Sequence, residues 1–383
     1  MLGSKFSRLL LGLALISASV SASADWMLNM SPGVTDVSRS VYNLHMVILA
    51  ICVVIAVVVF GVMFYAMLNH RKSQGAVAAN FHENTLVEIV WTVIPFAILI
   101  GMAIPATKTL TEIYEVEASE VTVEIVGYQW KWHYRYINED PDQEISFFSN
   151  LSTPADQIGL DSTAEKGEFY LLEVDEPLVL PTDTRVRFLI SANDVIHSWW
   201  VPDLAVKKDA VPGIVNEAWT KINKEGVYRG QCAELCGQLH GYMPIVVDAR
   251  SPEEFAAWRD EKLGNAAEEA ALGDKTDWTL DELMERGEAT YLTFCAACHQ
   301  ANGQGIPGAF PGLANSPVSL GDVNEHIRIV IEGVAGTAMQ AFGKQLSDLD
   351  VAAVVTYERN AWGNNTGDSV TPQDVAAFRA AGQ

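Results

Sequence analysis

The sequence predicts a multi-domain chain with a two-helix transmembrane hairpin, an all-β sandwich and an all-α C-terminal domain. Three observations support this prediction. Two long apolar runs lie in the first 110 residues, short β-rich runs separated by turn-forming residues follow, and the last stretch combines helical patterns with Gly/Pro-rich loops. A length of 383 residues is enough for two or three domains.

Residues 1–24 have the features of a signal peptide. Two cations, Lys5 and Arg8, precede an apolar stretch, and residues 22–24 read Ala-Ser-Ala, a small-residue cleavage signature. A transmembrane helix is the alternative interpretation, but the apolar stretch is short for one. The signal peptide therefore predicts that the following segments are exported.

Residues 25–110 are expected to form the transmembrane hairpin, with helices over about 41–68 and 86–107. Each run is long enough to cross a hydrocarbon core of about 30 Å. The short loop between them carries Arg71 and Lys72, so the positive-inside rule places this loop in the cytoplasm. The N-terminus and the large C-terminal part are then expected on the periplasmic side of a bacterial inner (plasma) membrane.

The rest of the chain divides into an all-β domain over 111–250, a partly helical linker over 251–277 and a helical domain over 278–383. The β-rich pattern is typical of an antiparallel sandwich or barrel. The runs that suggest strands are Val121–Val126, Phe169–Val174, Arg185–Ile190 and Ile245–Asp248.

The composition excludes one class of partner. The net charge is −23, although hydrophobic residues make up 49% of the chain. An acidic surface repels phosphates, which argues against a nucleic-acid partner. The acidity suits a basic or dipolar protein partner, or it simply keeps the soluble part in solution.

A sulfur- and imidazole-rich loop is the most specific motif in the β region. It reads Cys232-Ala-Glu-Leu-Cys236-Gly-Gln-Leu-His240-Gly-Tyr-Met243, and His197 lies upstream. Thiolate and thioether sulfur favour copper, and two thiolates on one loop can bridge two copper ions. The sequence therefore predicts a dinuclear copper site with the ligands His197, Cys232, Glu234 (through its backbone carbonyl), Cys236, His240 and Met243. A disulfide or a Cys2His2 zinc site is the alternative, but zinc would not need the methionine.

The helical domain contains a second motif, Cys295-Ala-Ala-Cys298-His299, which has the pattern of a c-type haem attachment site. The two thiols would add to the haem vinyl groups, and His299 would become the proximal iron ligand. A redox disulfide is the alternative interpretation of the bare pattern.

The distal iron ligand is expected to be Met339, because it is the only methionine after His299. His326 is the alternative. It falls in a helical pattern over Val323–Ile331, where we expect a solvent-facing histidine. A final helix over about Ser347–Asn360 is expected to pack Tyr357 against the first helix of this domain.

The copper loop resembles the CuA signature of cytochrome c oxidase subunit II. The runs Gly127-Tyr-Gln-Trp-Lys-Trp132, Ile196–Pro202 and Lys208–Gly213 also match that family, although Ile214 stands where the family usually has Arg. The order of motifs after residue 278 resembles a class I cytochrome c. These resemblances imply a cupredoxin-like Greek-key sandwich and a fused cytochrome c domain.

The resemblance also implies a function. Electrons from cytochrome c or another respiratory donor would pass through haem c and CuA to the haem of subunit I, where O2 is reduced to water and protons are translocated. Subunits I and III would be partners. The family assigns electron entry to the position of Trp130, Mg²⁺ binding at the subunit I interface to that of Glu234, and a proton-pathway entrance to that of Glu88.

Purely structural interpretations are the alternatives to the functional roles of two of these residues. Trp130 precedes Trp132, Tyr134 and Tyr136, an alternation that also fits an ordinary half-buried strand. Glu88 lies at the start of the second apolar run, where a carboxylate can also reach the membrane surface.

Two other kinds of protein share some of these features. A membrane-tethered redox shuttle, or a relative of nitrous oxide reductase, could use the same copper site. A shuttle, however, needs only one membrane anchor. The reductase would need a large His-rich catalytic domain, which this sequence lacks. A structural subunit of a quinol oxidase would lack the copper ligands. The hairpin and the complete ligand set therefore favour the oxidase.

Overall fold

The computed structural model describes residues 29–77, 80, 82–115, 118–154, 157–158, 162–273 and 275–381. The signal peptide expected over 1–24 lies outside these residues. The chain divides into two compact units. The first comprises Met1–Ile137, Phe147–Ser149 and Glu176–Pro252, and the second comprises Asn138–Ser146, Asn150–Asp175 and Glu253–Gln383.

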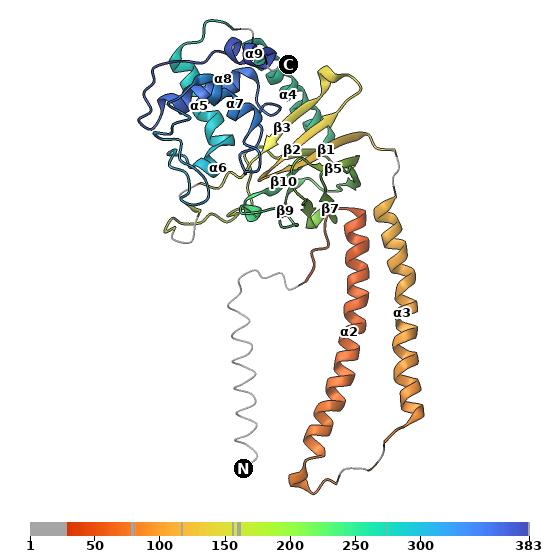
Figure 1. Cartoon of the computed structure of the whole chain (residues 1–383). Helices are drawn as coiled ribbons and strands as arrows, with labels where there is room; N and C mark the ends of the chain where they lie inside the picture. Colours follow the sequence, from red (N-terminus) through yellow and green to blue (C-terminus); the bar gives the residue numbers. More distant parts are fainter. Residues whose placement is uncertain are drawn as a thin grey trace. The chain divides into compact units, whose positions relative to one another are not determined.

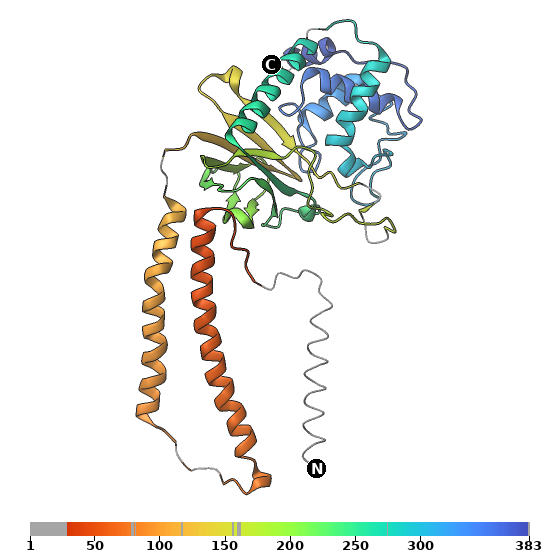
Figure 2. The same cartoon turned by 180° about the vertical axis from the view of Figure 1, so that it is seen from behind.

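Two long antiparallel helices form the hairpin, α2 (Asp36–Asn69) and α3 (Thr85–Tyr114), as Figures 1 and 2 show from opposite sides. Both are apolar and long enough to cross a membrane. They extend beyond the expected 41–68 and 86–107. Apolar runs mark only the part of a helix that lies in the hydrocarbon core, about 30 Å thick, whereas thirty residues of helix span roughly 45 Å. Thr35 and Asn84 begin the helices, and each side chain accepts a hydrogen bond from a backbone N–H of the first turn.

The first unit also contains a β-sandwich of two five-stranded sheets. One sheet has the order β3-β2-β1-β5-β8, with β1 (Val121–Tyr128), β2 (Lys131–Ile137), β3 (Ile145–Ser149), β5 (Arg185–Ala192) and β8 (Asn216–Lys221). The other has the order β4-β10-β9-β6-β7, with β4 (Leu178–Pro181), β6 (His197–Val201), β7 (Val206–Ala210), β9 (Gly226–Cys232) and β10 (Pro244–Arg250).

Large aromatic side chains fill the space between the two sheets. Phe188 of one sheet lies 5.1 Å from Trp199 of the other, measured between ring centroids. The indole N–H of Trp199 donates to the hydroxyl of Tyr134 at 3.3 Å, which satisfies a polar group in the core. Trp132, Tyr134 and Tyr136 are all buried, as the alternating pattern suggests.

Two sequence predictions about the strands were wrong. The sheets are not purely antiparallel: β1 pairs with β5, and β10 with β4, in parallel. Long connections between these partners permit this direction. In addition, Phe169–Val174 forms turns rather than a strand. Tyr170 N–H donates to Gly167, Leu172 N–H donates to Phe169, and Leu171 has a φ of 60°. An extended strand cannot include that backbone conformation. The end of the segment makes an isolated β-bridge from Val174 to Leu151.

The second unit is mainly helical. Its helices are α4 (Pro252–Gly273), α5 (Leu280–Phe294), α6 (Ala296–His299), α7 (Val323–Glu332), α8 (Asp348–Asn360) and α9 (Pro372–Ala381). Helix α5 crosses α8 closely at Gly287, where a Cβ would lie 2.1 Å from the carbonyl oxygen of Ala353. The ring of Tyr357 lies 5.6 Å from that of Tyr291 on α5, as the sequence predicts.

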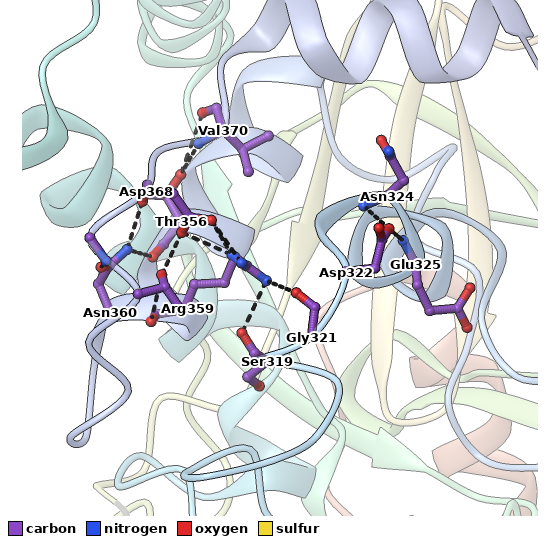
Figure 3. A network of polar contacts seen from close by, with 12 residues as sticks. Ser319, Gly321, Asp322, Asn324, Glu325, Thr356, Arg359, Asn360, Asp368 and Val370 are labelled. Atoms are coloured by element: carbon purple, nitrogen blue, oxygen red, sulfur yellow. Dashed lines mark hydrogen bonds and ion pairs between the residues drawn. The ribbon is translucent and has the colours of Figure 1, made fainter.

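A buried arginine fixes the loops around α7 and α8 (Figure 3). Arg359 donates to the carbonyls of Ser319 and Gly321, each at 3.1 Å, and pairs with Asp368 at 2.7 Å. Asp322 accepts bonds from the first backbone N–H groups of α7. Because the guanidinium meets carbonyl and carboxylate acceptors, its burial is compensated, and two loops distant in sequence are held together.

Candidate copper and haem sites

The pairing of strands β6 and β9 assembles the sulfur-rich site in the first unit. Strand β9 ends at Cys232, and β6 begins at His197. Since Trp199 of β6 pairs with Cys232, the side chains of His197 and Cys232 are brought together. The loop after β9 returns through a short 3-10 turn, His240–Tyr242, and the backbone N–H of Cys232 donates to the carbonyl of Met243 at 3.3 Å. Two strand ends, those of β6 and β9, and one loop thus supply all the predicted ligands.

The potential ligand atoms face one another at short range. The nitrogen and sulfur atoms of His197, Cys232 and Cys236 lie within 4.8 Å of one another, and all three residues are buried. The Sγ atoms of Cys232 and Cys236 are 3.9 Å apart. Further contacts join Cys232 Sγ to His197 Nδ1 (3.9 Å) and to the Glu234 carbonyl (3.4 Å), and Cys236 Sγ to His240 Nδ1 (3.4 Å) and Met243 Sδ (3.5 Å).

This geometry suits a pair of soft metal ions. The two sulfurs are too far apart for a disulfide, whose S–S bond is about 2.05 Å. Two thiolates, two imidazoles, a thioether and a carbonyl exceed the four ligands of structural zinc. Sulfur-rich donor sets with imidazole favour copper. The residues present therefore fit a dinuclear copper centre.

Electrostatics prepare the thiols for metal binding. The contact with Cys236 lowers the pKa of Cys232, and the same contact together with burial raises the pKa of Cys236. Metal binding has to displace the protons that these ligands still carry. Burial opposes protonation of His197, but Asp194 and Cys232 outweigh it and raise its pKa.

A carboxylate lies behind the first imidazole. Asp194 accepts hydrogen bonds from three groups: the backbone N–H of Gln129 (2.8 Å), the backbone N–H of Val195 (2.7 Å) and Nε2 of His197 (2.9 Å). Gln129 and Trp130 form the two-residue turn between β1 and β2. Both side chains also donate to the carbonyl of Cys236, at 2.7 and 3.2 Å.

The second unit carries the Cys-x-x-Cys-His motif at the end of α5 and along α6. Cys295 ends α5, and Cys298 and His299 lie on α6. Nδ1 of His299 lies 2.8 Å from the carbonyl oxygen of Pro311, which accepts its N–H. That bond selects the tautomer with a lone pair on Nε2, the nitrogen that a haem iron would take.

Met339 lies in the loop after α7 and is half-buried. It packs against the same hydrophobic core as Cys295 and Phe294. The loop closes tightly at Gly333, whose φ is 70° and where a Cβ would lie 2.5 Å from the carbonyl oxygen of Met339. The attachment residue Cys295 and the expected distal ligand therefore border one core, and the residues described fit a c-type haem.

Known proteins match the chain over most of its length. The "Probable cytochrome c oxidase subunit 2" of Rickettsia prowazekii is 40% identical over 233 residues, which cover 61% of this chain and 71% of that protein. The chain belongs to the cytochrome c oxidase subunit II family. The "Cytochrome c oxidase subunit 2" of Cyanidium caldarium is 36% identical over 245 residues, covering 63% of this chain and 93% of that protein.

Family models match all three parts of this oxidase subunit. They describe the transmembrane domain of cytochrome c oxidase subunit II (residues 23–109), its periplasmic domain (121–250) and subunit III of a cbb3-type cytochrome c oxidase (282–357). A solved periplasmic domain of subunit II from Bradyrhizobium japonicum is 33% identical. It covers 39% of this chain and 99% of that domain, with a TM-score of 0.34.

Subunit II of this kind is a membrane protein with a cupredoxin-like β-sandwich, and here it carries a cytochrome c domain. Copper and haem c are the cofactors that these domains imply. The ligand sets described above fit both. Subunit I of a haem–copper oxidase is the partner that the family implies.

The remaining predicted residues lie outside the ligand cluster. Trp130 is half-buried in the β1–β2 turn, rather than on a strand, and touches the copper loop through Cys236. Glu88 is exposed in the first turn of α3, where a carboxylate oxygen accepts from the Asn84 backbone N–H at 3.4 Å. The side chain of Glu234 is exposed, while its carbonyl faces Cys232.

Sequence reasoning missed Asp194 and Gln129. Gln129 lies within the family motif that contains Trp130, so its position was visible but its role was not. Asp194 precedes His197 by three residues, a spacing that allows a carboxylate to meet the imidazole from one loop. That spacing was the available signal.

The expectation of a solvent-facing His326 was wrong. Its side chain is 2% exposed, and Nε2 lies 2.7 Å from a carboxylate oxygen of Glu358, which is 5% exposed. The partner is 32 residues away on α8, so the pattern of α7 alone could not reveal it. Because Nε2 of His326 is paired with Glu358, only Nδ1 is left to meet an iron.

Replacing His326 with leucine is expected to destabilise the cytochrome domain by about 3 kcal/mol, since removal of one partner leaves a buried, uncompensated carboxylate. Denaturant unfolding followed by haem absorbance measures this change. Glu325→Gln is the matched control, because it removes the exposed Glu325–Arg328 pair of the same helix and should cost less than about 1 kcal/mol. Equal effects of the two variants would contradict the prediction.

Proposed function

We propose that this chain is the electron-entry subunit of a haem–copper terminal oxidase in a bacterial inner membrane. In this proposal electrons from cytochrome c or another respiratory donor reach haem c, then CuA and then the haem of subunit I, where O2 is reduced to water with proton translocation. The observation that carries the proposal is the buried cluster of His197, Cys232 and Cys236, which the side chains of His240 and Met243 also contact.

Each unit would bind its cofactor with its own residues. Cys295 and Cys298 would hold the haem covalently, with His299 and Met339 as axial ligands. The copper pair would be held by His197, Cys232, Cys236, His240 and Met243, with the Glu234 carbonyl. When bound, these groups supply one-electron carriers. Hydrogen bonds and packing hold their ligands in place, so that little rearrangement would accompany electron transfer.

The hairpin supports a fixed place beside subunit I. Two membrane-crossing helices with an Arg71–Lys72 loop favour a cytoplasmic loop and a periplasmic location for both soluble domains. In this arrangement subunit III is a further partner. The domain limits that we propose are 1–24 for a signal peptide, 25–110 for the hairpin, 111–250 for the CuA domain, 251–277 for the linker and 278–383 for the cytochrome domain.

Two acidic residues are proposed to serve the assembled complex. The exposed side chain of Glu234 is available to Mg²⁺ at the subunit I interface while its carbonyl faces the copper site. Glu88 lies at one end of α3, at the cytoplasmic end in the proposed orientation, where it would admit protons to a pathway in subunit I.

Trp130→Ala tests the proposed electron path. Trp130 lies against the Cys236 carbonyl, so its loss should slow reduction of the copper centre by roughly 10-fold, within the range for residues that support a metal site. Reduced donor is mixed with the purified complex in a stopped-flow instrument, and haem c, copper and the subunit I haem are followed separately.

The expected order of reduction is haem c, copper and then the subunit I haem, with only the last two delayed in the variant. Tyr114→Ala, a change to an exposed aromatic at the end of α3, serves as the control. Simultaneous reduction of copper and haem c at wild-type rates in Trp130→Ala would show that Trp130 only packs. Reduction of the subunit I haem before copper would contradict the proposed path itself.

A further inference from the structure

We propose that Asp194 is a positioning residue that fixes the copper ligand His197 and the Gln129–Trp130 turn relative to each other. This inference rests on the proposed copper centre. The two oxygens of the carboxylate meet different donors. Oδ1 accepts from His197 Nε2 and from the Val195 backbone, and Oδ2 accepts from the Gln129 backbone. A single carboxylate thus joins a ligand to the turn that carries Trp130.

The hydrogen bond to Asp194 determines which ring nitrogen of His197 is free to bind the metal. Since Nε2 carries the proton that Asp194 accepts, the lone pair lies on Nδ1, the nitrogen 3.9 Å from Cys232 Sγ. The imidazole is fully buried, whereas the carboxylate remains 17% exposed. A hydrogen-bonded carboxylate also strengthens the donor character of an imidazole ligand.

Packing leaves the imidazole little freedom apart from this bond. A Cβ at Gly127 would lie 2.7 Å from Cδ2 of His197, so β1 approaches the ring because residue 127 is glycine. The ring of Trp132 meets the imidazole edge-on, 5.9 Å between centroids. Strands β1 and β2, which carry these two residues, also hold the turn that Asp194 contacts.

The same turn reaches the copper loop on its other side. Gln129 and Trp130 donate to the Cys236 carbonyl, and a Cβ at Gly237 would lie 2.9 Å from the Gln129 amide nitrogen. The turn therefore contacts both a thiolate ligand, through Cys236, and an imidazole ligand, through Asp194. We infer that Trp130 keeps its position relative to the copper centre through these two connections.

Two variants separate the functions of the carboxylate. Asp194→Asn keeps an oxygen for His197 and Val195 but replaces the acceptor facing the Gln129 N–H with an amide donor. It should retain two coppers and raise their midpoint potential, because the anion behind His197 is lost. Electron transfer from haem c to copper should slow by roughly 10-fold. Asp194→Ala also releases the imidazole and should lower copper affinity by roughly 10- to 100-fold.

The test uses the purified oxidase complex. Copper content, the EPR signal of the copper pair, its potential by redox titration and the stopped-flow rate are measured. Asp183→Asn is the matched control, because it removes one exposed carboxylate from a turn of the same domain whose φ of 55° asparagine also tolerates. A potential and a rate equal to those of Asp183→Asn would overturn the proposal.

If Asp194→Asn loses its copper, Asp194→Glu decides the question, because it retains the charge and both acceptor oxygens. Recovery of copper with Glu supports the proposal. Failure to recover it would assign the requirement to side-chain volume and overturn the positioning role. A wild-type complex without the EPR signal of a copper pair would instead contradict the proposed function.

Discussion

Replacing Cys236 with serine is expected to abolish the dinuclear copper centre and to block electron delivery beyond haem c. Cys236 lies 3.9 Å from Cys232 Sγ, 3.4 Å from His240 Nδ1 and 3.5 Å from Met243 Sδ, so one sulfur contacts three of the other donors. A serine oxygen is a harder donor that copper binds poorly in place of thiolate. We expect reduction of the subunit I haem by the donor to fall by more than roughly 100-fold, beyond the usual effect of an outer-shell change.

Copper analysis and EPR of the purified complex check this result. The wild type should contain two more coppers than a Cys232→Ser/Cys236→Ser double variant, and haem c should remain reducible in both. Cys52→Ser is the control, since Cys52 is exposed on α2 and distant in sequence from the ligand loop. Retention of the paired-copper EPR signal in Cys236→Ser would rule out the proposed bridging role.

Ligands that are close in sequence were predictable, because their spacing carries the chemistry. Residues 232–243 place two thiols, an imidazole and a thioether on one loop, and few metal sites need that combination. The same holds for the haem attachment motif at Cys295–His299. His197 could be added because it lies in a second motif of the family, not because spacing placed it there.

Residues that meet through tertiary register were not predictable. Asp194 reaches Gln129 because β1 and β5 lie in parallel, with Gly127 opposite Ala192. No local pattern encodes that pairing, and the sequence suggested antiparallel strands. His326 was misjudged for a similar reason: one helix pattern shows which face is apolar, but not that a carboxylate from α8 pairs with a buried histidine.

Local sequence also predicted a strand where the apolar residues do not form one. Phe169–Val174 is rich in residues that favour strands, yet the structure turns the chain there, with a left-handed Leu171. Strand propensity depends on neighbours that fit a pleated surface, so it predicts little where such neighbours are absent. The transmembrane helices were easier to predict, because length and apolarity suffice there.

Replacing Met339 with leucine is expected to remove the distal haem ligand and to lower the haem potential. Leucine conserves the volume of methionine, so the half-buried site beside Phe294 and Cys295 keeps its packing and loses only the sulfur. Methionine raises the potential of a haem relative to histidine. We expect a decrease on the order of 0.1 V, a fraction of the roughly 0.8 V range that axial ligands span.

Absorbance spectroscopy and redox titration of the complex measure both effects. The methionine-to-iron charge-transfer band should disappear, and steady-state oxidase activity should fall, because a decrease on the order of 0.1 V corresponds to roughly 50-fold in the equilibrium for reducing this haem. Met284→Leu provides the control, since Met284 packs against the same core and is a methionine of the same domain. A wild-type spectrum that already lacks this band and does not change in Met339→Leu would transfer the ligand role to His326. In that case the iron would have to meet Nδ1 of His326, because Nε2 is paired with the buried Glu358.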